Sequence, residues 1–260
     1  MHRKLSKRLR KAFNGKLVFL DDYLNKYHVF NDRHHAGEVL TDLINSIFSA
    51  NEIFIMAIPC GGVPVGYTVS KRLKIPLDLL VCRKILIPWN REAGYGAVAP
   101  DGSVVLNERL LDFLKFSEDE VKEHINETLN EIERRIKLFR GIEEYKAIKS
   151  SVVVIDDGIA SGYTMLAAVK FLKKLKGIRE IIIGTPTAPP SAILLLILHV
   201  NLIICPNVRT EVYGFAVADA YKEWHDVSDE EVLRYIQELS DLYVPNKLKR
   251  DFILKGSSSL

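Results

Sequence analysis

Apolar runs alternate with segments of helical periodicity along most of the chain. Five short runs carry apolar residues at consecutive positions, at 53–58, 77–82, 152–155, 181–185 and 202–205. A strand that is covered on both faces of a sheet has this composition, whereas a strand with one solvated face alternates. With helical segments between the runs, the pattern predicts βαβ units and an open, mainly parallel sheet with helices on both faces.

Helical periodicity predicts the elements between and beyond these strands. We expect helices over 36–48 and 65–73, after Thr164, after the proline pair at 189–190, and after Ser228 near the C-terminal end. Proline suits the first turn of a helix, and serine suits the position that caps one. This order of elements is typical of an α/β protein.

A longer helix is predicted over 117–139. Ser117 and Glu120 can form a capping box at its start. Its apolar residues recur at helical spacing: Val121, Ile125, Leu129, Ile132 and Ile136. Because this helix interrupts the βαβ order, we interpret residues 109–145 as an insertion or an arm that faces a partner.

Composition restricts the class of protein. The 260 residues are 48% hydrophobic, which is enough for a full core. Lys and Arg number 36 against 33 acidic residues, so a nucleic-acid partner is not indicated. Residues 1–16 contain Lys and Arg but no acid. There we expect an amphipathic helix with a solvated face, in preference to an RNA or membrane contact.

Two further features bear on location. No apolar stretch approaches the about 20 residues that a membrane span needs, and no apolar segment of the secretory type follows the basic start. Cys60, Cys82 and Cys205 lie in or beside apolar runs without the spacing of metal ligands. We therefore expect buried thiols in a cytoplasmic protein.

The segment at 152–164, VVVIDDGIASGYT, contains the residues best suited to chemistry. A buried strand ends in the carboxylates of Asp156 and Asp157, and small residues lead into a helix. Backbone amides and the helix dipole favour an anion at such a place, and Ser161 and Thr164 add hydroxyl donors. Carboxylates repel a phosphate but suit vicinal hydroxyls or magnesium. Together these groups indicate a site for a ribose 5-phosphate.

This segment resembles the signature of the type I phosphoribosyltransferases, which bind phosphoribosyl pyrophosphate (PRPP). The resemblance implies that Asp156 and Asp157 hold the ribose hydroxyls and contact Mg²⁺, most of whose ligands PRPP supplies. It also implies that a loop wraps the 5-phosphate, formed by Gly158, Ile159, Ala160, Ser161, Gly162, Tyr163 and Thr164.

A second loop of the family, for pyrophosphate, would follow the strand at 53–58. Here Cys60, Gly61 and Gly62 stand at that place, and relatives often have a cis peptide there that does not involve a proline nitrogen. The chain departs from the family at Cys60, where an arginine or lysine is common. Arg83 and Lys84, which we expect to end the second strand, would stabilise the leaving pyrophosphate.

Longer stretches are similar to a phosphoribosyltransferase subgroup without an assigned substrate. They are RKI…EAGYGAVAPDGSVVLNE at 83–108, ERRIKLFRG at 133–141, and VADAYKEWHDVSDEEV at 217–232. The subgroup resemblance implies that part of 85–107, or the arm, closes over the site. The arm has three arginines, Arg134, Arg135 and Arg140. For the first two, a solvated helix face is the preferred interpretation.

In this family a small hood covers the acceptor base. Residues 206–226 loosely resemble the hood of the 6-oxopurine enzymes. By this resemblance, Tyr213 and Phe215 of this chain would stack on the base, and Asp219 would contact the base or a second Mg²⁺. However, Ala160 stands where those enzymes have an aspartate general base, and alanine cannot accept a proton. Adenine-type enzymes have alanine there. The acceptor base therefore stays open.

We accordingly expect three parts: a basic segment at 1–35 that contributes to the hood or surface, a core at 36–205, and a hood with a C-terminal helix at 206–260. The expected activity is Mg²⁺-dependent transfer of the phosphoribosyl group from PRPP to a nucleobase, a purine being favoured, with a nucleotide and pyrophosphate as products. A PRPP-sensing regulator without catalysis is the alternative. A homodimer is expected from the resemblance alone.

Overall fold

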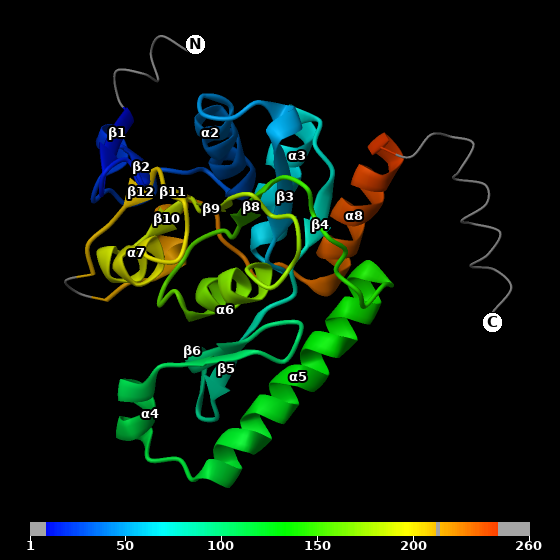
Figure 1. Ribbon diagram of the computed structural model, residues 1–260. Coiled ribbons are helices and arrows are strands. Elements are labelled where there is room, and N and C mark those ends of the chain that lie inside the picture. The colour runs from blue at the N-terminus through cyan, green and yellow to red at the C-terminus, as the bar shows by residue number, and fades with distance from the viewer. Residues whose placement is uncertain (1–8, 212–213, 244–260) are drawn as a thin grey trace, which may run out of the picture.

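The computed structural model describes residues 9–211 and 214–243, and a seven-stranded sheet forms its centre (Figure 1). In spatial order the strands are β1 (Leu9–Ala12), β2 (Leu17–Leu20), β11 (Leu202–Ile204), β9 (Ile181–Gly184), β8 (Ser151–Ile155), β3 (Ile53–Ala57) and β4 (Leu77–Leu79). All neighbours are parallel except β1 and β2. The five predicted strands and the parallel sheet are confirmed.

Helices cover both faces of this sheet. On one face lie α2 (Arg33–Asn45) and α3 (Gly62–Leu73), and on the other lie α6 (Tyr163–Leu172) and α7 (Pro190–Ile197). Successive side chains of a strand point to opposite faces. Val153 therefore packs with α2 and α3, while its neighbour Val154 packs with α6 and α7. Burial on both faces explains the continuous apolar runs.

The prediction of a helix in the basic N-terminal segment is wrong for the residues that the structure describes. β1 and β2 form a hairpin that extends the central sheet, with β2 parallel to β11. Leu17, Val18 and Leu20 are buried in the pairing, whereas Arg10 and Lys11 remain exposed. Sheet pairing and burial of the 17–20 strand outweigh the local helical preference of the segment. Residues 1–8 lie outside the described residues.

A long extension projects from one side of the sheet in Figure 1. It consists of a three-stranded antiparallel sheet, β5 (Arg83–Ile87), β6 (Asn90–Val98) and β7 (Val104–Leu106), and two helices, α4 (Glu108–Leu114) and α5 (Glu118–Arg140). The predicted capping box of Ser117 and Glu120 is present. The apolar stripe of α5 packs on β5 and β6, so most of the extension has a core of its own.

The three strands of the extension were not predicted from the sequence. Glycines at 94 and 96 obscure their pattern, and the structure explains both positions. A Cβ atom at Gly94 would lie 2.7 Å from the Ile85 carbonyl oxygen, and one at Gly96 would lie 2.6 Å from that of Val105. The close pairing of these strands therefore needs residues without a side chain.

The remaining elements lie mainly toward the carboxyl ends of the central strands. They are the 3₁₀ helices η1 (Asp21–Tyr23), η2 (Ala50–Glu52) and η3 (Val217–Ala220), the short strands β10 (Thr187–Ala188) and β12 (Asn207–Val208), and helix α8 (Asp229–Tyr243). α8 packs on α3 through Tyr235 and Tyr67, whose ring centroids are 4.8 Å apart. Among the described residues, no helix is both long and apolar enough to cross a membrane.

Candidate active site

The loop after β8 lies at the middle of the carboxyl edge of the sheet. β8 runs between β3 and β9, and α6 begins after Gly162, whose φ of +87° suits glycine. Gly158 lies against the 3₁₀ helix η3, since a Cβ atom at this position would overlap a methyl group of Val217. Ala160 and Ser161 are exposed. The predicted strand–loop–helix is present, with hood residues packed against one side of it.

The carboxylate of Asp157 is buried in an ion pair that the sequence did not indicate. The Nε–H of Arg33 donates to Asp157 Oδ2 over 2.8 Å, and another N–H of this guanidinium donates to the carbonyl oxygen of His225 over 2.8 Å. The guanidinium also stacks on Trp224 at 3.8 Å from the ring centroid. The hydroxyl of Tyr221 donates to the Asp157 carbonyl oxygen. Arg33 thereby joins the loop to the hood.

Asp156 has a different environment from its neighbour. Its Oδ1 accepts a hydrogen bond from the Asp157 amide over 2.9 Å. Burial, followed by the nearby charge of Asp157, raises the pKa of Asp156 well above its ordinary value, while Lys84 opposes this effect. For Asp157, burial also raises the pKa, but the ion pair with Arg33 opposes it. Asp157 is thus paired with a guanidinium group, whereas Asp156 accepts a hydrogen bond from a backbone amide.

The turn between β3 and α3 is in direct contact with this loop. Its Pro59–Cys60 peptide is cis, as the family resemblance implied. A Cβ atom at Gly61 would overlap Asp157 Oδ2, and one at Gly62 would lie 2.7 Å from the Ile155 carbonyl oxygen. The two glycines therefore allow the turn to pack closely on the loop after β8.

Cys60 lies on the other side of the same turn. Its thiol donates to Asp229 Oδ1 over 3.5 Å. Burial raises the pKa of this thiol to about 11. At neutral pH the residue is a neutral thiol.

Arg83 and Lys84 lie near the site, but they begin β5 instead of ending the preceding strand. The chain leaves the central sheet after β4, and pairing with β6 starts at Arg83. Lys84 is close enough to oppose the rise in the pKa of Asp156, and Arg83 is close enough to lower that of Cys60. The structure thus brings both cations toward the two loops.

The predicted base-contacting residues are packed on a buried arginine. Arg209 lies between the rings of Tyr27 and Phe215, with its guanidinium carbon 4.6 and 4.5 Å from the ring centroids. One of its N–H groups donates to Asp219 Oδ2 over 3.1 Å. Both Phe215 and Asp219 therefore have partners within the hood, and their role toward a base stays a prediction. Tyr213 lies outside the described residues.

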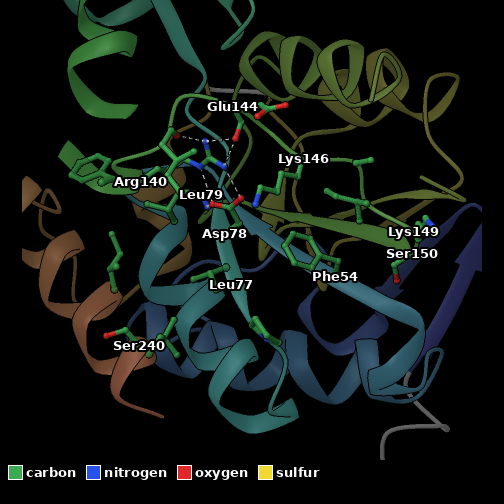
Figure 2. A pocket seen from close by; sticks show the side chains of 17 residues that line it. Phe54, Leu77, Asp78, Leu79, Arg140, Glu144, Lys146, Lys149, Ser150 and Ser240 are labelled. Carbon is green, nitrogen blue, oxygen red and sulfur yellow. Dashed lines mark hydrogen bonds and ion pairs between the residues drawn. The ribbon is translucent and has the colours of Figure 1, made fainter. Parts of the chain in front are cut away.

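The arginines of the arm separate into two places. Arg140 makes two hydrogen bonds of 2.9 Å to the Asp78 carboxylate and stacks on Tyr145. Figure 2 shows it among the side chains that line a cavity along β4. The cavity has a volume of about 730 Å³ and reaches Phe54 and Ser150, near the amino ends of β3 and β8. No residue of the turn at 59–62 or of the loop at 156–164 lines this cavity, so it is separate from the place where the two loops meet.

Arg134 and Arg135 instead lie beside the turn at Cys60. The exposed fraction of the side chain is 49% for Arg134 but only 18% for Arg135. The preferred interpretation of a solvated helix face is therefore wrong for Arg135, which is held between two carboxylates, Glu131 and Asp229.

The carboxylates at the end of β8 also allow a test of the expected magnesium ion. Among the described residues, no group of three or more His, Cys, Asp or Glu side chains could hold a metal. Mg²⁺ prefers oxygen ligands and commonly takes one or two carboxylates together with phosphates. Asp156 could supply one such carboxylate, whereas Asp157 is already paired with Arg33. The residues fit an ion that arrives largely coordinated by a phosphate compound.

Two Mycobacterium tuberculosis proteins are similar to nearly the whole chain. They are phosphoribosyl transferase MT0597, from strain CDC 1551 / Oshkosh, and phosphoribosyl transferase Rv0571c, from strain ATCC 25618 / H37Rv; both names mark the assignment as provisional. Each is 30% identical over 230 residues, or 88% of this chain. The chain spans about half (49%) of the length of these relatives. No family model matches it.

A solved structure is similar to most of the chain. The protein TT1426 from Thermus thermophilus superposes with a TM-score of 0.63 and 27% identity, over 81% of this chain and 98% of that one. The chain is thus homologous to proteins named phosphoribosyl transferases. Its loop after β8 and its turn after β3 have the features of the type I family that the sequence resembles.

Proposed function

We propose that the chain transfers the 5-phosphoribosyl group of PRPP to a nucleobase, with a purine as the favoured acceptor, and releases pyrophosphate. The observation that carries the proposal is the loop after β8. It combines a carboxylate at the end of a central strand, Asp156, with a hydroxyl-bearing loop at the start of α6. Carboxylate and phosphate-binding amides in one loop suit a ribose 5-phosphate.

Each part of PRPP has a complementary group in this arrangement. The 5-phosphate would accept hydrogen bonds from the 158–164 loop, and the ribose hydroxyls would donate to Asp156. Mg²⁺, when bound, would neutralise charge on the diphosphate. Arg83 and Lys84 would stabilise the charge that develops as pyrophosphate leaves. Positioning and electrostatic stabilisation would then account for catalysis.

The acceptor would approach the anomeric carbon from the face opposite to the pyrophosphate, with inversion at that carbon. Ala160 is exposed at the loop and has no group that could remove a proton from the base. This favours an acceptor whose attacking ring nitrogen has a free lone pair, or one that loses its proton to solvent. Because the adenine-type enzymes of the family have alanine at this position, adenine is the first acceptor to test.

The test is to incubate the protein with PRPP and Mg²⁺ and, in separate reactions, adenine, hypoxanthine, guanine, xanthine, uracil or orotate. Release of pyrophosphate that depends on one base would support the enzyme. PRPP binding without turnover on any base would replace it with the PRPP-sensing regulator. Changing both Asp156 and Asp157 to Asn should abolish PRPP binding, and unchanged affinity would refute the assignment of the site.

A further inference from the structure

Three segments distant in sequence meet at the turn that contains Cys60. They are the start of β5, the C-terminal half of α5 and the first residue of α8. Figure 1 shows α5 reaching the lower end of α8, and the Cys60 thiol contacts Asp229 at that end. The turn itself contributes no charged side chain, so charge at this place comes from the other segments.

Three guanidinium groups share two carboxylates here. Glu131 accepts from Arg134 over 2.7 Å and from Arg135 over 3.0 Å, and lies 3.7 Å from Arg83. Asp229 is 2.7 Å from Arg134 and 3.4 Å from Arg135. The cluster therefore has one more positive than negative charge, and the neutral Cys60 thiol does not offset it.

Like charges are held close together in this cluster. Burial lowers the pKa of Arg83, and the positive charge of Arg135 lowers it further. Bringing two cations together is unfavourable unless an anion compensates for it, and such arrangements are typical of functional sites. The bound carboxylates compensate only in part, because Arg83 lies 3.7 Å from the nearest of them.

Two neighbouring arginines of the cluster differ in burial. Arg135 has 18% of its side chain exposed and is one of the two cations, with Arg83, that lower the pKa of Cys60. Arg134 is 49% exposed, and its contacts are with the two carboxylates. Both arginines contact Glu131 and Asp229, but Arg135 is the more buried of the two and Arg134 the more exposed to solvent.

We propose that Arg135, acting with Arg83, binds the diphosphate group of PRPP at the turn 59–62. This inference rests on the proposed function and assigns its pyrophosphate-binding cation to the inserted helix α5. A guanidinium offers a rigid pair of N–H donors that match phosphate oxygens. Glu131 and Asp229 hold Arg135 in place, and the arrangement compensates for the absence of a basic side chain at position 60.

The experiment compares three ligands by calorimetry in the presence of Mg²⁺: PRPP, ribose 5-phosphate and inorganic pyrophosphate. Arg135→Gln should weaken binding of PRPP and pyrophosphate about 10- to 100-fold, as expected for loss of a charged hydrogen-bonding group. Binding of ribose 5-phosphate, which has no diphosphate, should stay within about twofold, on the same argument. The matched control is Lys137→Gln, which removes a positive charge from an exposed position of the same helix outside the cluster, where Lys137 lies 3.8 Å from Glu143. It should change binding of any of the three ligands by less than about threefold, as for an exposed pair.

A second variant separates binding from folding. Cys60→Arg places a guanidinium on the turn itself, so combining it with Arg135→Gln should restore at least part of the lost pyrophosphate affinity. The inference is wrong if Arg135→Gln weakens ribose 5-phosphate as much as PRPP, or if Lys137→Gln has the same effect as Arg135→Gln. Wild-type protein that binds PRPP through Arg135 but turns over no base would refute the proposed transfer and leave this inference standing. Wild-type protein that binds none of the three would refute both.

Discussion

The loop after β8 and the turn after β3 touch each other at the carboxyl edge of the sheet, but their chemical groups have different origins. In the loop, the carboxylates, small residues and hydroxyls are consecutive in the sequence at 156–164. The turn at 59–62 has backbone and one thiol, and its charges come from β5, α5 and α8. One region is a local motif, and the other is assembled by the fold.

This difference decides how each region responds to a substitution. A local motif keeps its groups together wherever its strand and helix are placed, whereas an assembled cluster depends on the packing of several elements. The distinction is not complete, because the buried carboxylate of the loop is paired with Arg33, 124 positions away in the chain. The predictions below test the comparison, starting with the largest expected effect.

Arg33→Gln should destabilise the fold by about 3–5 kcal/mol, because it leaves the buried carboxylate of Asp157 without its charged partner. The free energy of unfolding can be measured by urea titration. Arg10→Gln is the control, since the pair of Arg10 with Asp21 is exposed and should contribute at most about 1 kcal/mol. Equal losses in the two variants would show that the loop does not depend on its distant partner.

Gly61→Ala should destabilise the protein by about 1–3 kcal/mol, because the added methyl group would overlap the buried carboxylate of Asp157. This substitution tests the contact between the two regions. Cys60→Ala removes atoms from the same turn without adding any, and should change the midpoint of urea unfolding less. A Gly61→Ala protein as stable as the wild type would mean that the two loops are not in close contact.

Asp156→Asn should raise the free energy of unfolding at pH 7 while it weakens PRPP binding. The pKa of Asp156 is raised in the folded state, so its stabilising effect is complete below the unfolded pKa of about 3.9 and is lost as the pH rises. The side-chain amide of asparagine does not ionise, so the Asp156→Asn variant does not lose this stability as the pH rises. Relief of this kind commonly gives about 0.5–2 kcal/mol. The gain should be seen in thermal unfolding at pH 7 and should disappear near pH 3.

Glu131→Gln should have the opposite pH dependence and a smaller effect. A hydrogen bond from Arg134 lowers the pKa of Glu131 to about 2, so its stabilising effect is present above the unfolded pKa of about 4.3 and is lost as the pH falls toward 2. Because the pairs are partly exposed, the loss at pH 7 should be about 1 kcal/mol or less. Thermal unfolding from pH 2 to 7 measures it, and a loss that persists at pH 2 would contradict the assignment.

The sequence was sufficient for the parts that depend on periodicity and local chemistry. Continuous apolar runs predicted five central strands, because a strand buried on both faces contains few polar residues. The capping box at Ser117 and the stripe after it predicted α5, since both depend on residues three or four positions apart. The strands at 83–106 were missed because their glycines are needed for close backbone approach and contribute no apolar pattern.

By itself, the sequence determined the loop after β8 and predicted a class of ligand for it, because strand, carboxylates, small residues and helix start follow one another in the chain. Only the tertiary structure decided that Asp157 is bound by Arg33, that Phe215 and Asp219 pack on Arg209, and that Arg135 and Cys60 both contact Asp229. Each of these contacts joins residues brought together when helices, strands and hood pack. Their energies depend on burial and on distances of a few ångströms, which no spacing along a single segment specifies.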